Sequence, residues 1–257
     1  MTRVVAVHSF RGGTGKSNLT ANLAATLALD GRRVAIVDTD IQSPGIHVLF
    51  GLEGQDLERS LNDYLWGQCG IQDAAYDVSA TLPGGPRAAA AARGSLHLVP
   101  ASIKAAEIAR VLREGYDVEL LSTGVQALLA ELRLDYVLLD THPGLDEKTL
   151  LCLAISDVTL VVLRPDRQDY LGTAVTLEVA RKLDVPELRL VVNKVLPAMD
   201  RDALRQELEQ AYRTPVDGLL PVSEEVMQLA SGGIFCLRYP EHPWTRAIQA
   251  IAAQLGA

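Results

Sequence analysis

The sequence predicts an α/β fold, a doubly wound and mainly parallel sheet with helices on both faces. Short apolar runs typical of buried strands alternate along the chain with longer stretches of helical periodicity. Right-handed crossovers through such helices align the strands in parallel and cover both faces of the sheet. The 257 residues contain no internal repeat and no linker clear enough to divide them, so residues 1–257 are expected to form a single domain.

The first half of the chain supplies three of the expected strands. In order, the expected elements are a strand at 3–8, a helix at 16–30, a strand at 34–37, a helical stretch at 57–66 and a strand at 96–99. Gly31 is the expected cap of the first helix, because glycine accepts the left-handed turn that ends many helices. An irregular segment reaches residue 95, and within it the turn 83–86 and the alanine run 88–92 indicate an exposed loop or a short, poorly fixed helix.

The second half of the chain continues the alternation. Its expected elements are a helical region at 102–132, a strand at 136–140, a helix at 146–155, a strand at 158–163, a helix at 170–183, a strand at 188–193 and a helix at 200–212. A last helix carries Trp244, Ile248 and Ile251 on one face and has Arg246 as its single cation. We expect that face to pack on the sheet rather than on a membrane.

A glycine-rich turn between the first strand and the first helix carries the strongest functional signal. It reads Ser-Phe-Arg-Gly-Gly-Thr-Gly-Lys-Ser-Asn over residues 9–18. In such a strand–turn–helix unit, successive backbone N–H groups and the positive end of the helix dipole form a cradle for an anion. Lys16 is expected to reach the β- and γ-phosphates of a nucleotide, and the Ser17 hydroxyl to bind Mg²⁺. The predicted phosphate-binding residues are Gly12, Gly13, Thr14, Gly15, Lys16, Ser17 and Asn18.

Acidic residues follow two further expected strands. Asp38 and Asp40 come after the strand at 34–37, and Asp140 ends the strand at 136–140. Ligands of an open parallel sheet bind beyond the carboxyl ends of its strands, so these carboxylates are expected beside Lys16 and Ser17. Asp140 is expected to hold Mg²⁺ through water or together with Ser17. The alternative for each of these residues is an aspartate that only caps a turn.

The glycine-rich turn resembles the deviant Walker A loop of the MinD/ParA/Mrp group of P-loop ATPases, with Phe10 where the strict motif has glycine. In that group a signature lysine occupies the position of Arg11 and reaches across a dimer interface to the partner's nucleotide. The resemblance implies the same contact for Arg11, whose guanidinium fork suits phosphate oxygens. It also implies that Asp40 orients the attacking water and that Asp38 takes part in Mg²⁺ hydration.

Two later segments also resemble parts of this group. Residues 140–145 are similar to its second switch loop, usually Asp-Thr/Cys-Pro-Pro-Gly, with His142 in place of the first proline. The resemblance implies that the Gly144 N–H approaches the γ-phosphate, whereas His142 is expected to be a bystander. It also implies that Asn193 binds the adenine edge, unless Asn193 only caps its strand, and that Pro221 lies in a loop beside the base and ribose.

The resemblance implies an ATP-binding and ATP-hydrolysing switch that uses Mg²⁺. It would form an ATP-dependent homodimer and position or partition a cargo such as a division site, a chromosome or plasmid, or a protein assembly. Slow hydrolysis, stimulated by a protein partner, is expected. Iron–sulfur carriers of the Mrp type are excluded, since they need a Cys-x-x-Cys pair that the three cysteines do not form. The alternative is a metabolic enzyme of the same fold, such as a dethiobiotin-synthetase-like ATP-dependent ligase.

The surface on which such a switch acts is weakly marked. The net charge of −8 argues against a surface that attracts nucleic acid or anionic lipid everywhere. Arg201, Arg205 and Arg213 share a helix face only broadly, which leaves non-specific DNA as an alternative partner and a membrane as a weaker one. No apolar run reaches about 18 residues, and the chain enters a strand without a signal-peptide pattern. A cytoplasmic protein is therefore expected.

Overall fold

The computed structural model describes residues 2–84 and 94–256, and its centre is one eight-stranded sheet. The strand order is β3-β4-β2-β5-β1-β6-β7-β8, and every neighbouring pair is parallel except β3 with β4. The strands are β1 (Arg3–His8), β2 (Arg33–Asp38), β3 (Tyr76–Asp77), β4 (Ser95–Val99), β5 (Tyr136–Asp140), β6 (Val158–Leu163), β7 (Glu187–Val195) and β8 (Val216–Pro221). The predicted fold class is confirmed.

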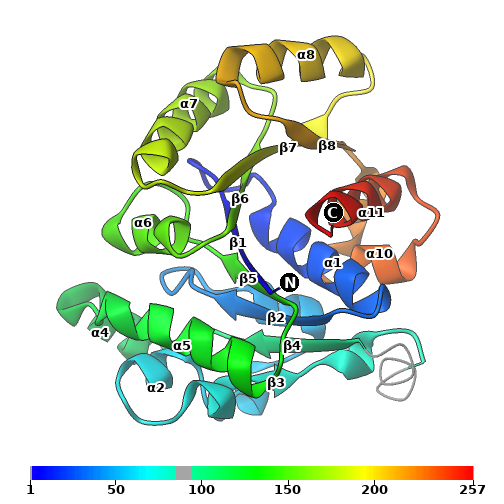
Figure 1. The fold of residues 1–257 in the computed structure, drawn as a ribbon. Helices are drawn as coiled ribbons and strands as arrows, with labels where there is room; N and C mark the ends of the chain where they lie inside the picture. The colour runs from blue at the N-terminus through cyan, green and yellow to red at the C-terminus, as the bar shows by residue number, and fades with distance from the viewer. Residues whose placement is uncertain (1, 85–93, 257) are drawn as a thin grey trace.

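Helices cover both faces of this sheet (Figure 1). They are α1 (Lys16–Leu29), α2 (Leu61–Leu65), α4 (Ala105–Glu114), α5 (Val118–Glu131), α6 (Glu147–Ala154), α7 (Arg167–Lys182), α8 (Arg201–Tyr212), α9 (Glu224–Leu229), α10 (Phe235–Arg238) and α11 (Pro243–Leu255). Helices α1, α10 and α11 lie on one face, and α5, α6, α7 and α8 lie on the other. This is the doubly wound arrangement that alternating strands and helices predict.

Helix α1 is buried between the sheet and α11, and both of its ends are set by glycine. It begins directly after Gly15 and ends at Leu29. Gly31 has a φ of 82°, and the N–H of Gly31 donates to the carbonyl of Ala28 at 3.1 Å. The predicted stop at Gly31 is therefore confirmed to within one residue, because Asp30 occupies the formal cap position.

The structure corrects several predicted boundaries. The helical region expected at 102–132 is two helices, α4 and α5, because Gly115 takes a φ of 68° and the Asp117 carboxylate caps the N–H of Glu119. The stretch expected at 57–66 contains only the short helix α2. Strands β3 and β8 and helices α9 and α10 were not predicted. The alanine run 88–92 and part of the expected loop at 83–95 lie outside the described residues.

Helix α11 returns the end of the chain to its beginning. Its apolar residues Trp244, Ile248, Ile251 and Leu255 are buried in the same cluster as Leu19 and Leu23 of α1. The last helix packs on β8 and α1, so its expected packing on the sheet is confirmed. Within residues 2–84 and 94–256, no helix is long and apolar enough to cross a membrane.

Candidate nucleotide site

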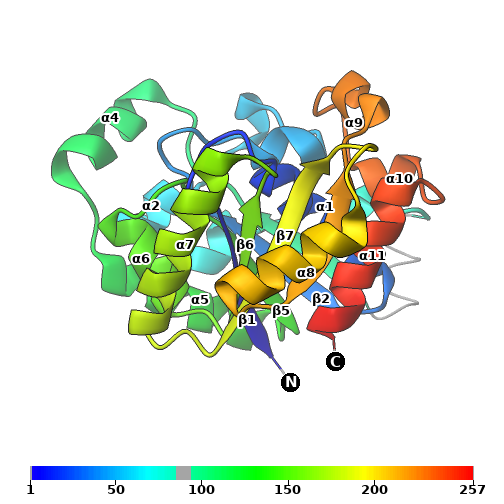
Figure 2. The same ribbon diagram turned by 90° about the horizontal axis from the view of Figure 1, so that it is seen from above.

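Strand order brings the predicted site residues to one edge of the sheet. Strand β1 lies between β5 and β6, and β5 lies between β1 and β2. The turn after β1 therefore meets the ends of β2 and β5, and Asp38 pairs in register with Asp140. Figure 2 shows the opposite edge at the bottom of the view, where both chain termini lie. The predicted grouping of Lys16, Asp38 and Asp140 is what the topology produces.

The glycine-rich turn has the backbone geometry of an anion cradle. Gly13 and Gly15 have φ values of 75° and 95°, which favour glycine, and a Cβ on Gly15 would lie 2.5 Å from the amide nitrogen of Asn193. No side chain caps the start of α1. The first N–H groups of this helix are therefore left to bind an anion, together with the dipole of a 14-residue helix.

A cavity of about 240 Å³ opens directly over this turn. Its lining consists of Gly12, Gly13, Gly15, Lys16, Ser17, Asn18, Asp40, Ser43 and Pro143. Lys16 is only 7% exposed, and burial lowers the pKa of its ammonium, although the charges of Asp140 and Asp40 oppose that shift. A buried cation at the floor of the cavity favours an anionic ligand. The cavity can therefore hold phosphate groups.

Two buried carboxylates, Asp38 and Asp140, lie side by side at the ends of β2 and β5. Burial, together with the neighbouring acidic residues, raises the pKa of Asp38 well above its usual range. Burial also raises the pKa of Asp140 to about 6, although hydrogen bonds from Ser17 and Thr20 oppose that shift. Asp38 Oδ2 is buried and has no partner within the described residues. An unpaired carboxylate oxygen on Asp38, next to an Asp140 carboxylate that is hydrogen-bonded to the Ser17 hydroxyl, offers ligands that suit Mg²⁺, so the residues fit the predicted metal.

The described residues contain no group of three or more His, Cys, Asp or Glu side chains that could hold a metal ion. A site that uses Ser17, Asp38 and Asp140 has fewer acidic ligands than such a cluster. Mg²⁺ commonly binds through one or two carboxylates and takes its other ligands from water and substrate phosphates. The donor set here matches that pattern.

A second cavity, of about 410 Å³, adjoins the first. Both cavities are lined by Gly13, Gly15 and Asn18, and the second is also lined by Asn193, Lys194, Pro221, Val222, Ser223, Val226, Met227, Ala230, Ser231 and Trp244. Its mixture of apolar side chains with a few polar groups suits a nucleoside. The two cavities meet at the glycine-rich turn, as the two ends of a nucleotide would require.

Asn193 lines the second cavity, but its amide is already engaged with the backbone. Its Nδ2 donates to the carbonyl of Thr14 at 2.8 Å, and its Oδ1 accepts from the N–H of Lys194 at 2.8 Å. The Lys194 ammonium also donates to the carbonyl of Gly13 at 3.0 Å. In this structure Asn193 therefore braces the glycine-rich turn from β7, and its contact with a base stays a prediction.

Arg11 lies outside both cavities and points toward α7. Its side chain is 41% exposed, and its guanidinium donates to the side chain of Gln168 and lies 3.9 Å from the carboxylate of Asp169. The preceding residue, Phe10, packs against Gly172 on the same helix, where a Cβ would lie 2.2 Å from the ring. Helix α7 thus holds the outer part of the turn, and Arg11 remains accessible on the surface.

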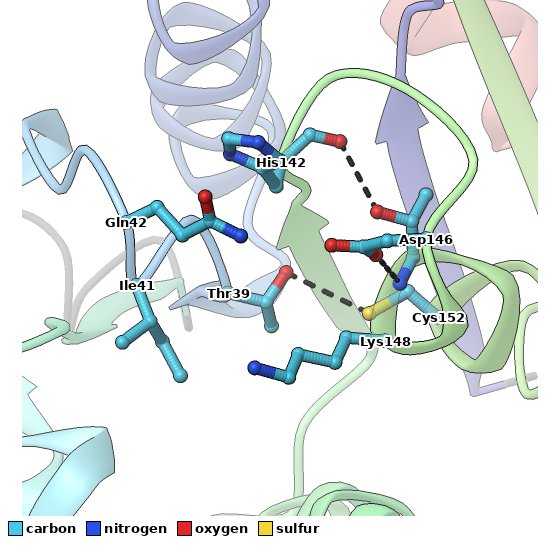
Figure 3. Close-up of a pocket in the computed structure, with 8 residues that line it drawn as sticks. Thr39, Ile41, Gln42, His142, Asp146, Lys148 and Cys152 are labelled. Atoms are coloured by element: carbon cyan, nitrogen blue, oxygen red, sulfur yellow. Dashed lines mark hydrogen bonds between the residues drawn. The ribbon is translucent and has the colours of Figure 1, made fainter. Parts of the chain in front are cut away.

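The loop after β5 places His142, rather than Gly144, next to the predicted catalytic aspartate. The Gly144 N–H donates to the carbonyl of Ser9 at 3.1 Å, so it is already paired in this structure. The Nδ1 of His142 lies 2.8 Å from Oδ1 of Asp40, a contact that the sequence did not indicate for a residue expected to be a bystander. The same loop lines a small cavity with the residues that follow β2, including Thr39, Ile41 and Gln42 (Figure 3).

Several residues of the site were missed by the sequence reasoning. Thr20 lies one turn after Ser17 on α1, and this helical spacing could have indicated it. Ser43 lies three residues after Asp40, a spacing at which an aspartate side chain commonly accepts from the backbone of the following turn, so the sequence could have indicated Ser43 as well. Lys194, Met227 and Trp244 have no such signal, because only the folding of β7, α9 and α11 brings them to the second cavity.

Two of the three arginines considered for DNA contacts are engaged within the chain. Arg201 and Arg205 on α8 donate to the carbonyls of Leu219 and Val216 in β8. Arg205 also lies 3.8 Å from Glu209. These hydrogen bonds fasten α8 to the edge strand and restrict where the two guanidinium groups can point.

Comparison with known proteins places this site in a described family. The family model for the CobQ/CobB/MinD/ParA nucleotide binding domain matches residues 5–234. A Methanocaldococcus jannaschii protein described as an uncharacterized ATP-binding protein is 27% identical over 256 residues, which cover 99% of this chain and 88% of the relative. The septum site-determining protein MinD of Synechocystis is 25% identical over 232 residues, which cover 88% of this chain and 79% of that protein.

Solved structures show the same fold. Pyrococcus horikoshii MinD in complex with Mg-ADP superimposes with a TM-score of 0.82 at 22% identity, covering 99% of this chain and 96% of that one. Aquifex aeolicus MinD, solved in a MinC:MinD complex, gives 0.80 at 20% identity over 99% and 96% of the two chains. Mycobacterium smegmatis cobyrinic acid a,c-diamide synthase, with an ATP analogue and magnesium bound, gives 0.73 at 23% identity over 99% and 94%.

Proposed function

The chain belongs to the CobQ/CobB/MinD/ParA family of nucleotide-binding domains, and on that premise we propose that it is an ATP-driven switch. It binds ATP with Mg²⁺, pairs with a second copy of itself and acts on a cargo until slow hydrolysis separates the pair. The observation that carries this proposal is the junction of the two cavities at the glycine-rich turn, with Lys16 on the floor of the smaller one.

Each site residue has a distinct task in this proposal. Residues 12–18 hold the phosphates through backbone N–H groups, and Lys16 neutralises charge on the β- and γ-phosphates. Ser17, Asp38 and Asp140 would hold Mg²⁺, which supplies positive charge to the phosphate oxygens when it is bound. The larger cavity, lined by Asn193 and Pro221, receives the nucleoside.

Asp40 is the residue we assign to the hydrolytic step. It lines the phosphate cavity together with Lys16 and can accept a hydrogen bond from a water molecule held in line with the γ-phosphate. The water oxygen forms a bond to the γ-phosphorus as the bond to the β–γ bridging oxygen breaks, and ADP and phosphate leave. A single oriented carboxylate, without a partner, supports only slow turnover.

A metabolic enzyme of the same fold is the second candidate. Its support is the fold likeness to a cobyrinic acid a,c-diamide synthase, at a TM-score of 0.73. Such an enzyme consumes ATP only when its small-molecule substrate is present, and it does not require ATP-dependent dimerisation. The switch hydrolyses ATP slowly without any such substrate.

Light scattering on an Asp40→Ala variant tests the proposed switch. Loss of the water-orienting carboxylate should trap the ATP state, so we expect a stable dimer with ATP and Mg²⁺ and a monomer with ADP. Lys16→Ala should stay monomeric with either nucleotide, because it loses the phosphate contact. Asp30→Ala, at the far end of α1, is the matched control and should behave as wild type. A monomeric Asp40→Ala protein with ATP bound would contradict the switch.

A further inference from the structure

His142 reaches the predicted catalytic carboxylate from a different loop. Asp40 follows β2, whereas His142 follows β5, and the two residues are 102 positions apart in the chain. Their side chains meet at 2.8 Å between Nδ1 and Oδ1. An ionised carboxylate only accepts hydrogen bonds, so the Nδ1 of His142 carries the hydrogen in this contact.

All the hydrogen bonds that the described residues make to the Asp40 carboxylate reach one of its two oxygens, Oδ1. Oδ1 also accepts from the backbone N–H and the hydroxyl of Ser43, at 3.1 Å and 3.0 Å. With the imidazole, three donors converge on Oδ1. Asp40 and Ser43 nevertheless both line the phosphate cavity. The second oxygen, Oδ2, is the one that remains available to accept from water.

The loop that carries His142 is itself held in place. The backbone carbonyl of His142 accepts a hydrogen bond from the hydroxyl of Thr149, near the start of α6, at 3.3 Å. Thr39, the neighbour of Asp40, donates to the carbonyl of Asp140 at 2.9 Å and lies 3.6 Å from the sulfur of Cys152. Figure 3 shows His142, Thr39 and Gln42 facing one another around the small cavity between the two loops. The imidazole is therefore a side-chain link between two anchored segments.

We propose that His142 is a positioning residue, whose Nδ1–H holds Oδ1 of Asp40 so that Oδ2 faces the attacking water. The inference rests on the proposed function, since it deepens the role given there to Asp40. A proline at this position, as in the family's usual motif, has no side-chain donor and no N–H. His142 can therefore give Asp40 an orienting hydrogen bond that a proline at this position could not give.

Steady-state kinetics on two His142 variants test this role. His142→Leu removes the donor, and we expect kcat for ATP to fall about tenfold, the effect of one lost orienting hydrogen bond, with KM unchanged within about twofold. His142→Asn keeps an N–H donor near the position of Nδ1 and should restore most of kcat. A merely structural role would not distinguish these variants at equal thermal stability. His97→Leu on β4 is the matched histidine control and should leave kcat unchanged.

A spectroscopic measurement tests the contact without turnover. In ¹⁵N-labelled, nucleotide-free protein, we expect NMR to show the Nδ1–H tautomer of His142 in the wild type and its loss in Asp40→Ala. An Nε2–H tautomer in the wild type would overturn the proposal. So would a rise in kcat for His142→Leu, because the contact would then restrain Asp40 rather than orient it. If wild type hydrolyses no ATP, the proposed function fails, and the NMR result still decides whether the contact exists.

Discussion

Burial opposes the ionisation of two site residues, Asp38 and Asp140. The pKa of Asp140 is raised to about 6, and the pKa of Asp38 is raised too, because both carboxylates are buried side by side. An acid whose pKa is higher in the folded state binds protons more tightly there than in the unfolded chain. Stability is therefore lost as pH rises from about 4, the unfolded value, to about 6. The charge that a metal ion needs destabilises the metal-free fold.

Replacing Asp140 by asparagine should stabilise the metal-free protein. At pH 7.5 with EDTA, we expect Asp140→Asn to raise the free energy of unfolding by about 3 kcal/mol, because about two pKa units of unfavourable ionisation disappear. Urea unfolding measures this change, and the difference between variant and wild type should shrink at pH 5. Added Mg²⁺ with ADP should stabilise wild type more than the variant. A variant less stable than wild type at pH 7.5 would show that the Asp140 charge is already compensated.

The sequence predicts the location of single site residues better than it predicts their partners. Lys16, Ser17 and Asp140 could be placed at one site because a strand, a turn and a helix start fix their surroundings locally, and their chemical roles stay predictions. The contact of Asn193 with Thr14 could not be predicted, because the two residues are 179 positions apart in the chain. The contact of His142 with Asp40 could not be predicted either, since the two residues are 102 positions apart in the chain.

Among the elements, the central strands were predictable and the edge strand β8 was not. The central strands are continuous apolar runs, as expected for a parallel sheet covered on both faces. Strand β8 contains Asp217 and Gly218, which interrupt that pattern. Asp217 is buried and paired with Arg189 of β7 at 3.2 Å, so the strand tolerates its charge. An ion pair between two strands cannot be predicted from the sequence pattern of either strand alone.

Helix α7 positions the residue that we propose as a dimer contact. Arg11 lines neither cavity and rests on Gln168 and Asp169 of α7, so it contributes little to nucleotide binding in one chain. We expect Arg11→Ala to keep the affinity for ATP within about twofold and to weaken the ATP-dependent dimer of Asp40→Ala about tenfold, since a guanidinium–phosphate contact across the interface is lost. A fluorescent ATP analogue measures the affinity, and analytical ultracentrifugation measures the dimer.

The Arg11 experiment has a matched control on α4. Arg113→Ala removes an exposed arginine of α4 and should leave both affinities unchanged. Equal dimer affinities for Arg11→Ala and Arg113→Ala would contradict the proposed contact of Arg11 with the second subunit. Arg11→Lys should retain part of the dimer affinity, because lysine keeps the charge and loses the fork.

At the scale of the molecule, we propose that the described residues behave as a single domain. One sheet takes strands from residue 3 to residue 221, and α11 packs back on α1 near the start of the chain. The site is assembled from both halves, since the turn after β1 is braced by Asn193 of β7. Unfolding of any large part would therefore dismantle the cradle, which couples stability to nucleotide binding.

The charge of the whole molecule favours a protein partner over DNA or a membrane. The chain carries a net charge of −8. On α8, Arg201 and Arg205 donate to carbonyls of β8, and Arg205 also lies 3.8 Å from the carboxylate of Glu209. The apolar face of α11 is buried. In co-sedimentation with duplex DNA and with anionic vesicles, we expect the ATP-bound Asp40→Ala dimer to stay in the supernatant from about 50 to 200 mM salt, because phosphate contacts need free cations. ATP-dependent pelleting with DNA that weakens steeply as salt rises would identify DNA as the surface, and pelleting with vesicles would identify a membrane.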